Sequence, residues 1–340
     1  MGMKNIVKIF VGVAFAALVT IFAVAYGWYF DNRKPNFVFP AEIYVCPGLD
    51  AEEILSQIPD SCIVSRKSLV RVMKGLEKEQ IKSGHYLLEK GKPSVYLPRM
   101  LRGGWQTPVR LVLSGTMRTK GSIARKISNQ MLLDSVVIAG ALSDDELLSR
   151  YGFSSVDAFS LIVPDTYEIY WTASAEEILD VQKKAWDSFW TEENLSKAAS
   201  VGLTPREVSI LASIVKAESN YEKDYPSIAG VYLNRLRLGM RLQADPTVAF
   251  CYDYSLKRIL LKHLEVDSPY NTYLHEGLPP GPICVPDKAC LKAVLNPDRR
   301  DFLYFCASPA MDGTHRFAST LSEHNRNAAE FQRELNKRSK

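Results

Sequence analysis

Apolar positions between residues 204 and 218 recur at the three- and four-residue spacing of a helix face. They are Val208, Leu211, Ile214 and Val215. Before them, Thr204, Pro205 and Glu207 supply an N-cap, a first-turn proline and the acid of a capping box. Glu218 continues the apolar stripe by one more turn. The pattern therefore predicts a helix with a carboxyl group on its core-facing side, where partial desolvation favours the protonated form.

A second pattern is the uncharged, mostly apolar run from Ile9 to Phe30, which is long enough to cross a bilayer as one helix. Ala23-Val24-Ala25 resembles a signal-peptide cleavage site, so a cleaved signal is the alternative. Apolar residues continue past that site, from Tyr26 to Phe30, and we therefore expect residues 1–30 to be an uncleaved anchor. Either interpretation places the folded part outside the cytoplasm. Basic residues nearly balance across the run, so they decide its orientation only weakly (Lys4 and Lys8; Arg33 and Lys34).

Residues 31–40 are polar, contain two prolines and are expected to form a short linker. Glu42–Cys46 and Ser83–Leu88 then have the composition of strands, and two helices between them are predicted to begin after the caps Asp50 and Ser65. This β-α-α-β order over residues 41–105 resembles a LysM-like module, a type that can hold glycan chains. The alternative is a plain spacer.

A further strand, Val109–Leu113, is followed by predicted helices at Ser122–Leu132 and Asp144–Tyr151. Because strands and helices alternate but close by hairpin-like returns, we expect an α+β fold rather than a doubly wound sheet. Residues 106–158 then form a connecting α/β unit, and residues 159–340 form the catalytic domain. A polar helix is expected at its end, from Glu323 to Lys340.

Composition narrows the function only slightly. A net charge of +4 suits attraction to an anionic polymer or membrane, but it is no nucleic-acid signature. None of the six cysteines forms a Cys-x-x-Cys pair, so zinc and thioredoxin-like sites are not expected. Cys46 with Cys62, or Cys284 with Cys290, are candidate disulfides of an exported protein, and small buried side chains are the alternative.

Several short motifs occur in a fixed order around Glu218. Together they closely resemble the YceG-like endolytic murein transglycosylases over about residues 160–326. The motifs are Pro164-Asp165-Thr166-Tyr167, Asn234-Arg235, Gln243-Ala244-Asp245-Pro246-Thr247, Tyr270-Asn271-Thr272-Tyr273, Gly277–Ile283, His315-Arg316-Phe317 and Glu323-His324-Asn325.

The resemblance implies a lytic transglycosylase that cuts the bond from N-acetylmuramic acid to N-acetylglucosamine within nascent peptidoglycan strands. Glu218 would act as acid and then as base, leaving a 1,6-anhydro end that terminates strand elongation. Its implied setting is a single-pass protein of the cytoplasmic membrane with an extracytoplasmic catalytic domain. Its partners would be glycan strands and membrane-bound synthases (penicillin-binding proteins). No cofactor is implied, and His315 and His324 lack a helical metal-ligand spacing, so no metal is expected.

Other residues of the motifs are candidates for substrate binding. Asp245 either stabilises oxocarbenium charge or shapes a turn, and its place before Pro246 predicts an extended backbone. Amide groups suit N-acetyl groups, and aromatic faces suit pyranose rings, with core packing as the alternative for the tyrosines. Asn234 and Arg235 are expected to orient Glu218, and the alternative for Arg235 is a pairing with another acid that serves only the fold. The full set is Asn234, Arg235, Gln243, Asp245, Thr247, Tyr270, Asn271, Thr272, Tyr273 and Tyr167.

The chain departs from the family's pattern in three places. Lys216 stands where many relatives have an acid, and it would lower the pKa of Glu218 if it pointed inward, although helical spacing turns it away. Phe159-Ser160 replaces the usual pair before the Pro-Asp-Thr-Tyr motif, and Val285 and Asp287 alter the segment after the proline-rich loop.

Two other functions fit the same residues. The first is a muramidase that hydrolyses the bond with two carboxylates, Glu218 as acid and Asp245 as nucleophile or base. The second is a non-catalytic, membrane-anchored scaffold that binds the cell wall through the LysM-like module. Products with anhydro ends separate the transglycosylase from the muramidase, and any cleavage excludes the scaffold.

Overall fold

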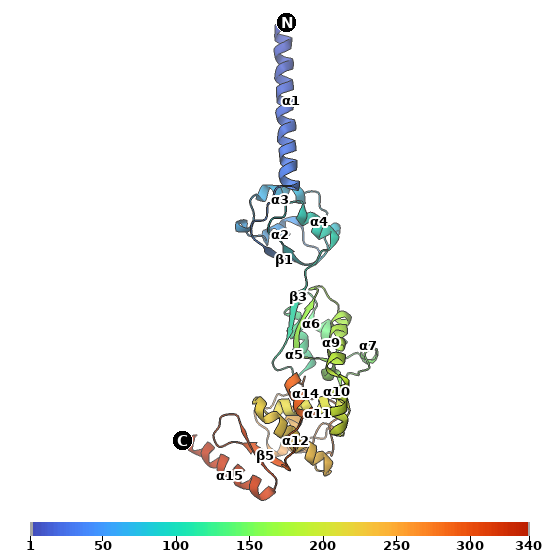
Figure 1. Ribbon diagram of the computed structural model, residues 1–340, viewed down its shortest axis with the longest axis vertical. Coiled ribbons are helices and arrows are strands. Elements are labelled where there is room, and N and C mark those ends of the chain that lie inside the picture. Colours follow the sequence, from blue (N-terminus) through green and yellow to red (C-terminus); the bar gives the residue numbers. More distant parts are fainter. Residues whose placement is uncertain (1–2, 339–340) are drawn as a thin grey trace. The chain divides into compact units, whose positions relative to one another are not determined.

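The computed structural model describes residues 3–338, and these form a mixed α+β structure (Figure 1). The contacts divide the chain into two compact units. Unit 1 comprises the residues up to Arg110 together with Glu168–Ala173, and unit 2 comprises Leu111–Tyr167 together with the residues from Ser174 onward. The described strands pair in three two-stranded sheets, β1-β2, β3-β4 and β5-β6.

Unit 1 begins with the long helix α1 and continues with a small β-α-α-β arrangement. Strands β1 and β2 are antiparallel, with Ala41 opposite Leu88 and Val45 opposite Gly84. Asp50 and Ser65 cap the two helices between them, as the sequence predicts. The elements are α1 (Met3–Asn32), β1 (Ala41–Val45), α2 (Ala51–Ser56), α3 (Arg66–Met73), β2 (Gly84–Leu88), α4 (Tyr96–Gly103) and the start of β3 (Val109–Leu113), with short 3₁₀ turns at Asp60–Cys62 and Lys78–Gln80.

The apolar N-terminal segment forms a single helix. Its part from Val7 to Asn32 is the one described helix that is long and apolar enough to cross a membrane. Its side chains are exposed along the apolar stretch, which is consistent with a surface that faces lipid.

The predicted linker at residues 31–40 is instead packed into unit 1, which corrects that expectation. Helix α1 continues through Asn32, and Asp31 is buried against Arg71. The Asn36 amide donates to the Ser94 hydroxyl at 2.8 Å and to the Ser65 carbonyl at 3.1 Å. Phe37 is 1% exposed within the core of unit 1. The buried polar side chains of this segment, Asp31 and Asn36, are therefore satisfied by unit 1, so the segment is no free tether.

Unit 2 is mostly helical. Its first helix, α5, begins after the cap Thr119 and ends at Ser128, which is earlier at both ends than the sequence predicts. The elements are β3, α5 (Lys120–Ser128), α6 (Ser135–Ala141), α7 (Asp145–Ser149), α8 (Ala158–Leu161), β4 (Asp165–Ile169), α9 (Ala175–Phe189), α10 (Glu192–Ser200), α11 (Pro205–Glu218), α12 (Tyr225–Arg237), α13 (Asp245–Cys251), α14 (Lys288–Leu295), β5 (Tyr304–Ala307), β6 (His315–Ala318) and α15 (Leu321–Arg338), with 3₁₀ turns at Glu222–Asp224 and Leu261–Glu265.

Helix α11 is the centre of unit 2. Its cap, first-turn proline and capping box are confirmed at Thr204, Pro205 and Glu207. Every residue from Val208 to Val215 is buried, because α12, α13 and α14 pack around it. An amphipathic surface helix would bury only its apolar stripe, so α11 is a core helix.

The proline-rich loop before α14 is fixed on α11. The backbone N–H of Ile283 donates to the buried Ser213 hydroxyl at 3.0 Å, and the Tyr254 hydroxyl donates to the Ile283 carbonyl at 2.6 Å. A Cβ at Gly281 would lie 2.2 Å from the Val156 carbonyl oxygen, so only glycine fits there. The loop is therefore a rigid wall of unit 2.

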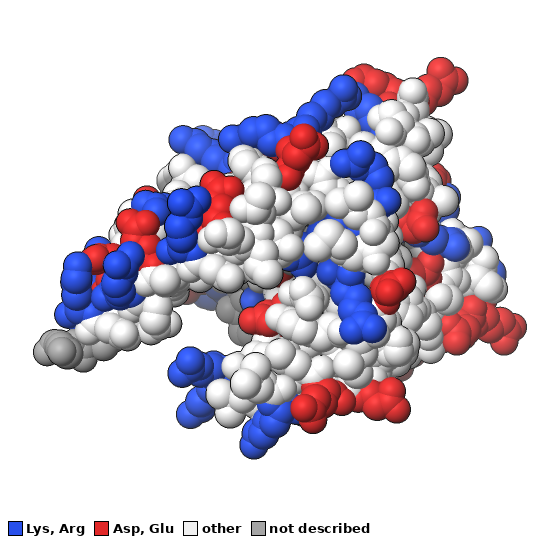
Figure 2. Space-filling model, turned by 90° about the horizontal axis from the view of Figure 1, so that it is seen from below, with Lys and Arg blue, Asp and Glu red and all other residues white. Residues whose placement is uncertain are grey.

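The C-terminal helix α15 packs on β5 and β6 but buries none of its residues. Figure 2 shows mostly basic, with some acidic, side chains along this helix, which extends to the left of the view. The polar terminal helix predicted from Glu323 to Lys340 is confirmed up to Arg338, and its last two residues lie outside the described residues.

Two glycines of unit 2 allow its helix packing to be tested. Gly230 lies inside α12, where an added Cβ would be 2.4 Å from the Asp298 carbonyl oxygen. We expect Gly230→Ala to lower the free energy of unfolding by about 1–3 kcal/mol, because overpacking outweighs the better helix propensity of alanine. Gly140 lies in α6 with nothing within 4 Å of the added atom. Gly140→Ala should therefore be neutral or slightly stabilising in thermal unfolding followed by circular dichroism. Equal behaviour of the two variants would contradict the described contact.

Candidate active site

Glu218 is the last residue of α11, and its side chain lies where three surface hollows meet. The two larger hollows have volumes of about 530 and 360 Å³, and the third is a small cleft of about 60 Å³. Ser219, directly after it, has an extended backbone, so the helix ends at the hollows. The buried helix thus delivers one carboxyl group to an open surface.

The carboxyl group of Glu218 is held by a tyrosine. The Tyr232 hydroxyl donates a hydrogen bond to Glu218 Oε1 at 2.5 Å. Burial raises the pKa of Glu218 to about 7, and the negative charge of Asp245 adds to the rise, while the Tyr232 bond and the Arg235 charge oppose it. A carboxyl group with this pKa is available both as an acid and as a base near neutral pH.

Five of the predicted residues meet in the hollow of about 360 Å³. They are Glu218, Arg235, Gln243, Asp245 and Tyr273. The hollow is completed by Tyr232, Leu242, Tyr304, Phe305, Leu321 and His324. Two carboxyl groups, an amide, a guanidinium and aromatic rings therefore surround one space, which suits a polar ligand with ring faces.

Asp245 stands at the start of helix α13, not in the extended segment that the sequence predicts. The extended residue is Ala244, and Pro246 fits the first helical turn because that position needs no amide hydrogen. The Tyr273 hydroxyl donates to Asp245 Oδ1 at 2.6 Å. Burial, and then this bond to Asp245, raise the pKa of Tyr273 above its ordinary value, so its proton stays in place.

Arg235 fastens the walls of the hollow together. Its Nε donates to the Leu303 carbonyl at 2.7 Å, and its Nη1 donates to the Leu242 carbonyl at 2.8 Å. The guanidinium also lies over the Tyr304 ring, 5.2 Å from its centroid. Helix α12 is thereby joined to the segment before Gln243 and to β5.

Three predicted binding residues are buried scaffold. Thr247 and Thr272 share a hydroxyl contact of 2.9 Å, and Thr272 also accepts from the Ala244 N–H at 3.0 Å. The Asn271 amide donates to the carbonyls of Leu264 and Val266 at 2.9 and 2.8 Å. These side chains hold the segment of Gln243 and Asp245 against the Tyr273 segment.

Gln243 has a left-handed backbone, with φ of 50°, which is uncommon for a residue with a side chain. Its N–H donates to the Thr272 carbonyl at 3.1 Å, so the buried threonines fix this conformation. Strained residues of this kind often lie at functional sites.

Three predicted residues lie outside the hollows around Glu218. Tyr167 donates to the Val163 carbonyl at 2.5 Å, and Tyr270 packs on Phe250 with ring centroids 4.5 Å apart. Asn234 lies on the opposite face of α12 from Tyr232 and donates to the carbonyls of Arg300 and Phe302.

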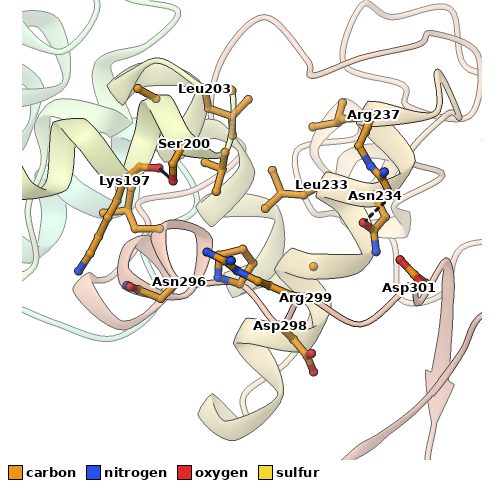
Figure 3. A pocket seen from close by; sticks show the side chains of 17 residues that line it. Lys197, Ser200, Leu203, Leu233, Asn234, Arg237, Asn296, Asp298, Arg299 and Asp301 are labelled. Carbon is orange, nitrogen blue, oxygen red and sulfur yellow. Dashed lines mark hydrogen bonds between the residues drawn. The ribbon is translucent and has the colours of Figure 1, made fainter.

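Figure 3 shows Asn234 in another and larger hollow of unit 2, of about 1060 Å³, between α10, α12 and the segment after α14. Two acidic residues line it: Asp301 is exposed, and Asp298 is paired with Arg300, which lowers the pKa of the Asp298 carboxyl group to about 2. A carboxylate this acidic cannot serve as a general acid near neutral pH. Size alone therefore does not identify the site, and the smaller hollows at Glu218 have the suitable chemistry.

Four aromatic residues that line the hollow were not among the predicted binding residues: Tyr232, Tyr304, Phe305 and His324. Tyr232 precedes Arg235 by three residues, and this spacing places both on one face of α12. His324 stacks on Tyr304 at 5.4 Å, and burial, followed by the charge of Arg235, lowers the pKa of this histidine. A neutral imidazole is therefore expected beside the hollow.

Two departures from the family's pattern contact each other. Lys216 Nζ lies 2.7 Å from Asp287 Oδ2, and their side chains are 24% and 26% exposed. Asp287 also caps α14. Burial opposes the charged form of Lys216, but the bond to Asp287 leaves its pKa raised. Asp287 therefore holds the lysine, whose helical spacing is expected to turn it away from Glu218. Besides burial, the groups that shift the pKa of Glu218 are Tyr232, Asp245 and Arg235.

The second large hollow extends from Glu218 toward the β5-β6 hairpin. Asn220, Tyr221, Ser308 and His315 line it, and the His315 N–H and ring Nδ1 both lie within 2.9 Å of Asp224 Oδ2. Within residues 3–338, no group of three or more His, Cys, Asp or Glu side chains is placed to hold a metal ion. All six cysteines lie in this range and are unpaired, and Cys284 and Cys290 are buried.

Known proteins resemble this chain over most of its length. A protein named endolytic murein transglycosylase from Bacillus subtilis (strain 168) is 38% identical over 153 residues, 45% of this chain and 42% of that protein. One of the same name from Streptococcus pneumoniae serotype 2 (strain D39) is 32% identical over 178 residues, 50% of this chain and 31% of that protein. The matched segments thus span less than half of these relatives.

A crystal structure of a putative YceG-like protein from Listeria monocytogenes matches with a TM-score of 0.55 and 26% identity, covering 84% of this chain and 98% of that one. The sequence profile of the YceG-like family matches residues 43–330. This match includes both units, the site and the segments that support it. The chain therefore belongs to the YceG-like family.

Proposed function

We propose that this protein is an endolytic murein transglycosylase that cleaves peptidoglycan glycan strands and leaves 1,6-anhydro ends. The observation that carries the proposal is Glu218, a carboxyl group with its pKa raised to about 7 at the junction of two large hollows. The names of the relatives from Bacillus and Streptococcus agree with it.

In the proposed reaction Glu218 first donates its proton to the oxygen between N-acetylmuramic acid and N-acetylglucosamine. The bond from C1 of the muramic acid to that oxygen breaks, and the glucosamine leaves with the proton. The carboxylate then removes the proton from the C6 hydroxyl, whose oxygen bonds to C1. General acid-base chemistry of this kind contributes about 10²–10⁴-fold in rate.

The surrounding groups favour this sequence of steps. Asp245 is negative and lies in the same hollow, so it stabilises positive charge that develops at C1. Tyr232 donates to the carboxylate form of Glu218 and keeps it oriented between the two steps. Because hollows extend from Glu218 on two sides, a strand can continue past the cleaved bond in both directions, which supports internal cleavage.

We further propose the domain organisation 1–30 anchor, 41–105 LysM-like module, 106–158 connecting unit and 159–340 catalytic domain, with residues 31–40 fixed between anchor and module. In this proposal α1 crosses the cytoplasmic membrane once and the catalytic domain is extracytoplasmic. Glycan strands and membrane-bound peptidoglycan synthases are the partners, and the LysM-like module is a second glycan contact. Carbonate extraction tests the anchor, and the full chain should remain with the membranes.

Replacing the acid should abolish cleavage. We expect Glu218→Gln to lower turnover by at least ~10²-fold, because an amide can neither donate nor accept the proton. Glu222→Gln, an exposed change four residues later, is the control and should leave turnover unchanged. Turnover is measured by mass spectrometry of digested glycan strands. If Glu218→Gln keeps more than about a hundredth of wild-type turnover, Glu218 is not the acid.

The pH profile should report the pKa of Glu218. Since the acid must be protonated to act, turnover should fall as the pH rises through about 7. The Tyr232 bond lowers this pKa, so Tyr232→Phe should move the falling limb to higher pH. Tyr225→Phe removes another buried hydroxyl of α12, one that contacts Lys216, and should leave the limb in place. If turnover falls at the same pH in the wild type and in both variants, the assigned role of Tyr232 is contradicted.

The second carboxylate distinguishes the two mechanisms. We expect Asp245→Asn to lower turnover but to keep anhydro ends, because a group that only stabilises charge is not consumed in the reaction. An obligatory nucleophile or base would lose nearly all activity on this change. Reducing ends made by the wild-type enzyme would show that water is the acceptor and that the protein is a muramidase.

A further inference from the structure

Helix α3 in unit 1 has a basic outer face. Lys67, Val70, Arg71 and Lys74 are exposed and follow the i, i+3, i+4, i+7 spacing of one helix side. With Arg66 they line a shallow hollow of about 310 Å³. The opposite side of α3 is buried through Ser68, Leu69 and Met73. The orientation of the helix is therefore fixed, and its basic face cannot turn inward.

The basic face is joined directly to the end of the apolar helix. Arg71 donates from Nε and Nη2 to the two carboxylate oxygens of Asp31, each at 2.6 Å. The Ser68 hydroxyl donates to the same carboxylate at 2.5 Å. Asp31 belongs to α1, and α1 and α3 are in contact (Figure 1). No free linker separates them, because residues 31–40 are packed into unit 1.

The length of α1 sets the level of this face relative to a bilayer. The run Ile9–Phe30 rises roughly 33 Å at about 1.5 Å per residue, close to the hydrocarbon thickness of about 30 Å. Asp31 is the next residue and therefore stands at the boundary with the head groups, whose layer is roughly 5–8 Å deep on each side. Tyr26, Trp28 and Tyr29 are exposed on α1 just before it, as in an interfacial aromatic belt. The outer face of α3 therefore lies at head-group level.

Two of the charges on this face are free to bind a ligand. Arg66 is occupied by Asp60 and by the carbonyls of Leu55 and Ile58, and Arg71 is occupied by Asp31. The side-chain ammonium groups of Lys67 and Lys74 have no hydrogen-bond or ion-pair partner within the described part of the chain. The nearby acids Asp31 and Asp60 are already neutralised, so the face keeps a positive excess.

We propose that the outer face of α3 binds the anionic phospholipid head groups of the leaflet in which α1 ends. Lys67 and Lys74 contact the lipid phosphates, and Val70 between them lies against the upper acyl region. The inference rests on the proposed anchor, but not on the proposed cleavage reaction or on the side of the membrane, since either leaflet presents the same chemistry. Its consequence is that unit 1 is held on the bilayer by a second contact besides α1.

Amine labelling of the full chain in lipid nanodiscs tests this contact. The discs contain either phosphatidylcholine alone or about one-third phosphatidylglycerol, and each basic residue near an anionic surface is expected to gain about fivefold in binding. Lys67 and Lys74 should therefore acetylate at least about fivefold more slowly in the anionic discs, and high salt should remove the difference. Lys78 and Lys82 are the internal control. Lys78 contacts Gly48 and Lys82 contacts Leu101, at the end of the β1-β2 sheet that is farther from the segment of Asp31 and Asn36. Equal labelling of Lys67 and Lys74 in both discs would overturn the proposal.

A pair of double variants provides the second test. Photoreactive phosphatidylglycerol in the anionic discs should cross-link to the α3 peptide of the wild type, and Lys67→Gln/Lys74→Gln should lower the yield at least about fivefold. Lys78→Gln/Lys82→Gln removes the same charge elsewhere in unit 1 and should keep the yield. Soluble glycerol phosphate polymer added to phosphatidylcholine discs must not protect Lys67 and Lys74; protection there would assign the face to a wall polymer instead. Neither measurement requires cleavage activity, and carbonate extraction tests the anchor separately, so a failure of this inference is distinct from a failure of the proposed reaction.

Discussion

The site depends on a carboxyl group placed where a negative charge is disfavoured. Glu218 ends α11, and the C-terminal end of a helix carries partial negative charge, which adds to the effect of burial on this carboxyl group. The Tyr232 hydroxyl offsets part of that cost by donating to the charged form. The balance keeps both protonation states accessible, and this requires a helix that cannot shift. Full burial of α11 from Val208 to Val215 supplies that rigidity.

A second layer of residues holds the opposite wall. Arg235 binds backbone carbonyls on both sides of the hollow, so its charge is used to fix the chain rather than to meet a ligand. Thr247, Asn271 and Thr272 also fix the chain at this wall, through bonds of their buried hydroxyl and amide groups. Many motif residues of the family therefore hold a few others in place, and the residues that remain to face the hollow are Glu218, Gln243, Asp245 and Tyr273.

The sequence predicted the parts that depend on local chemistry. The cap and first turn of α11, the capped helices of unit 1 and the strands β1, β2 and β3 follow from short patterns and were found within a few residues. The position of Glu218 followed from helical spacing. Tertiary contacts decided the rest. Asp31 and Asn36, in the polar segment at residues 31–40, are buried because distant groups satisfy them, and Asp245 begins a helix that no periodic pattern marks. Asn234 and Arg235 both bond carbonyls of the segment from Arg300 to Leu303, but only Arg235 reaches the hollow of Glu218, and the packing of α12 against that distant segment decides this.

The pairing of Lys216 with Asp287 also constrains how such a chain arises by descent. Either residue alone would be a partly buried ion without an opposite charge next to it, which costs stability. The two positions are far apart in sequence, yet each one makes the other tolerable. A lineage that reaches this pair one substitution at a time must pass through a less fit intermediate, unless the first change is masked by another neighbour. The two positions are thus expected to be inherited as a unit, and in related chains a lysine at the first should coincide with an acid at the second.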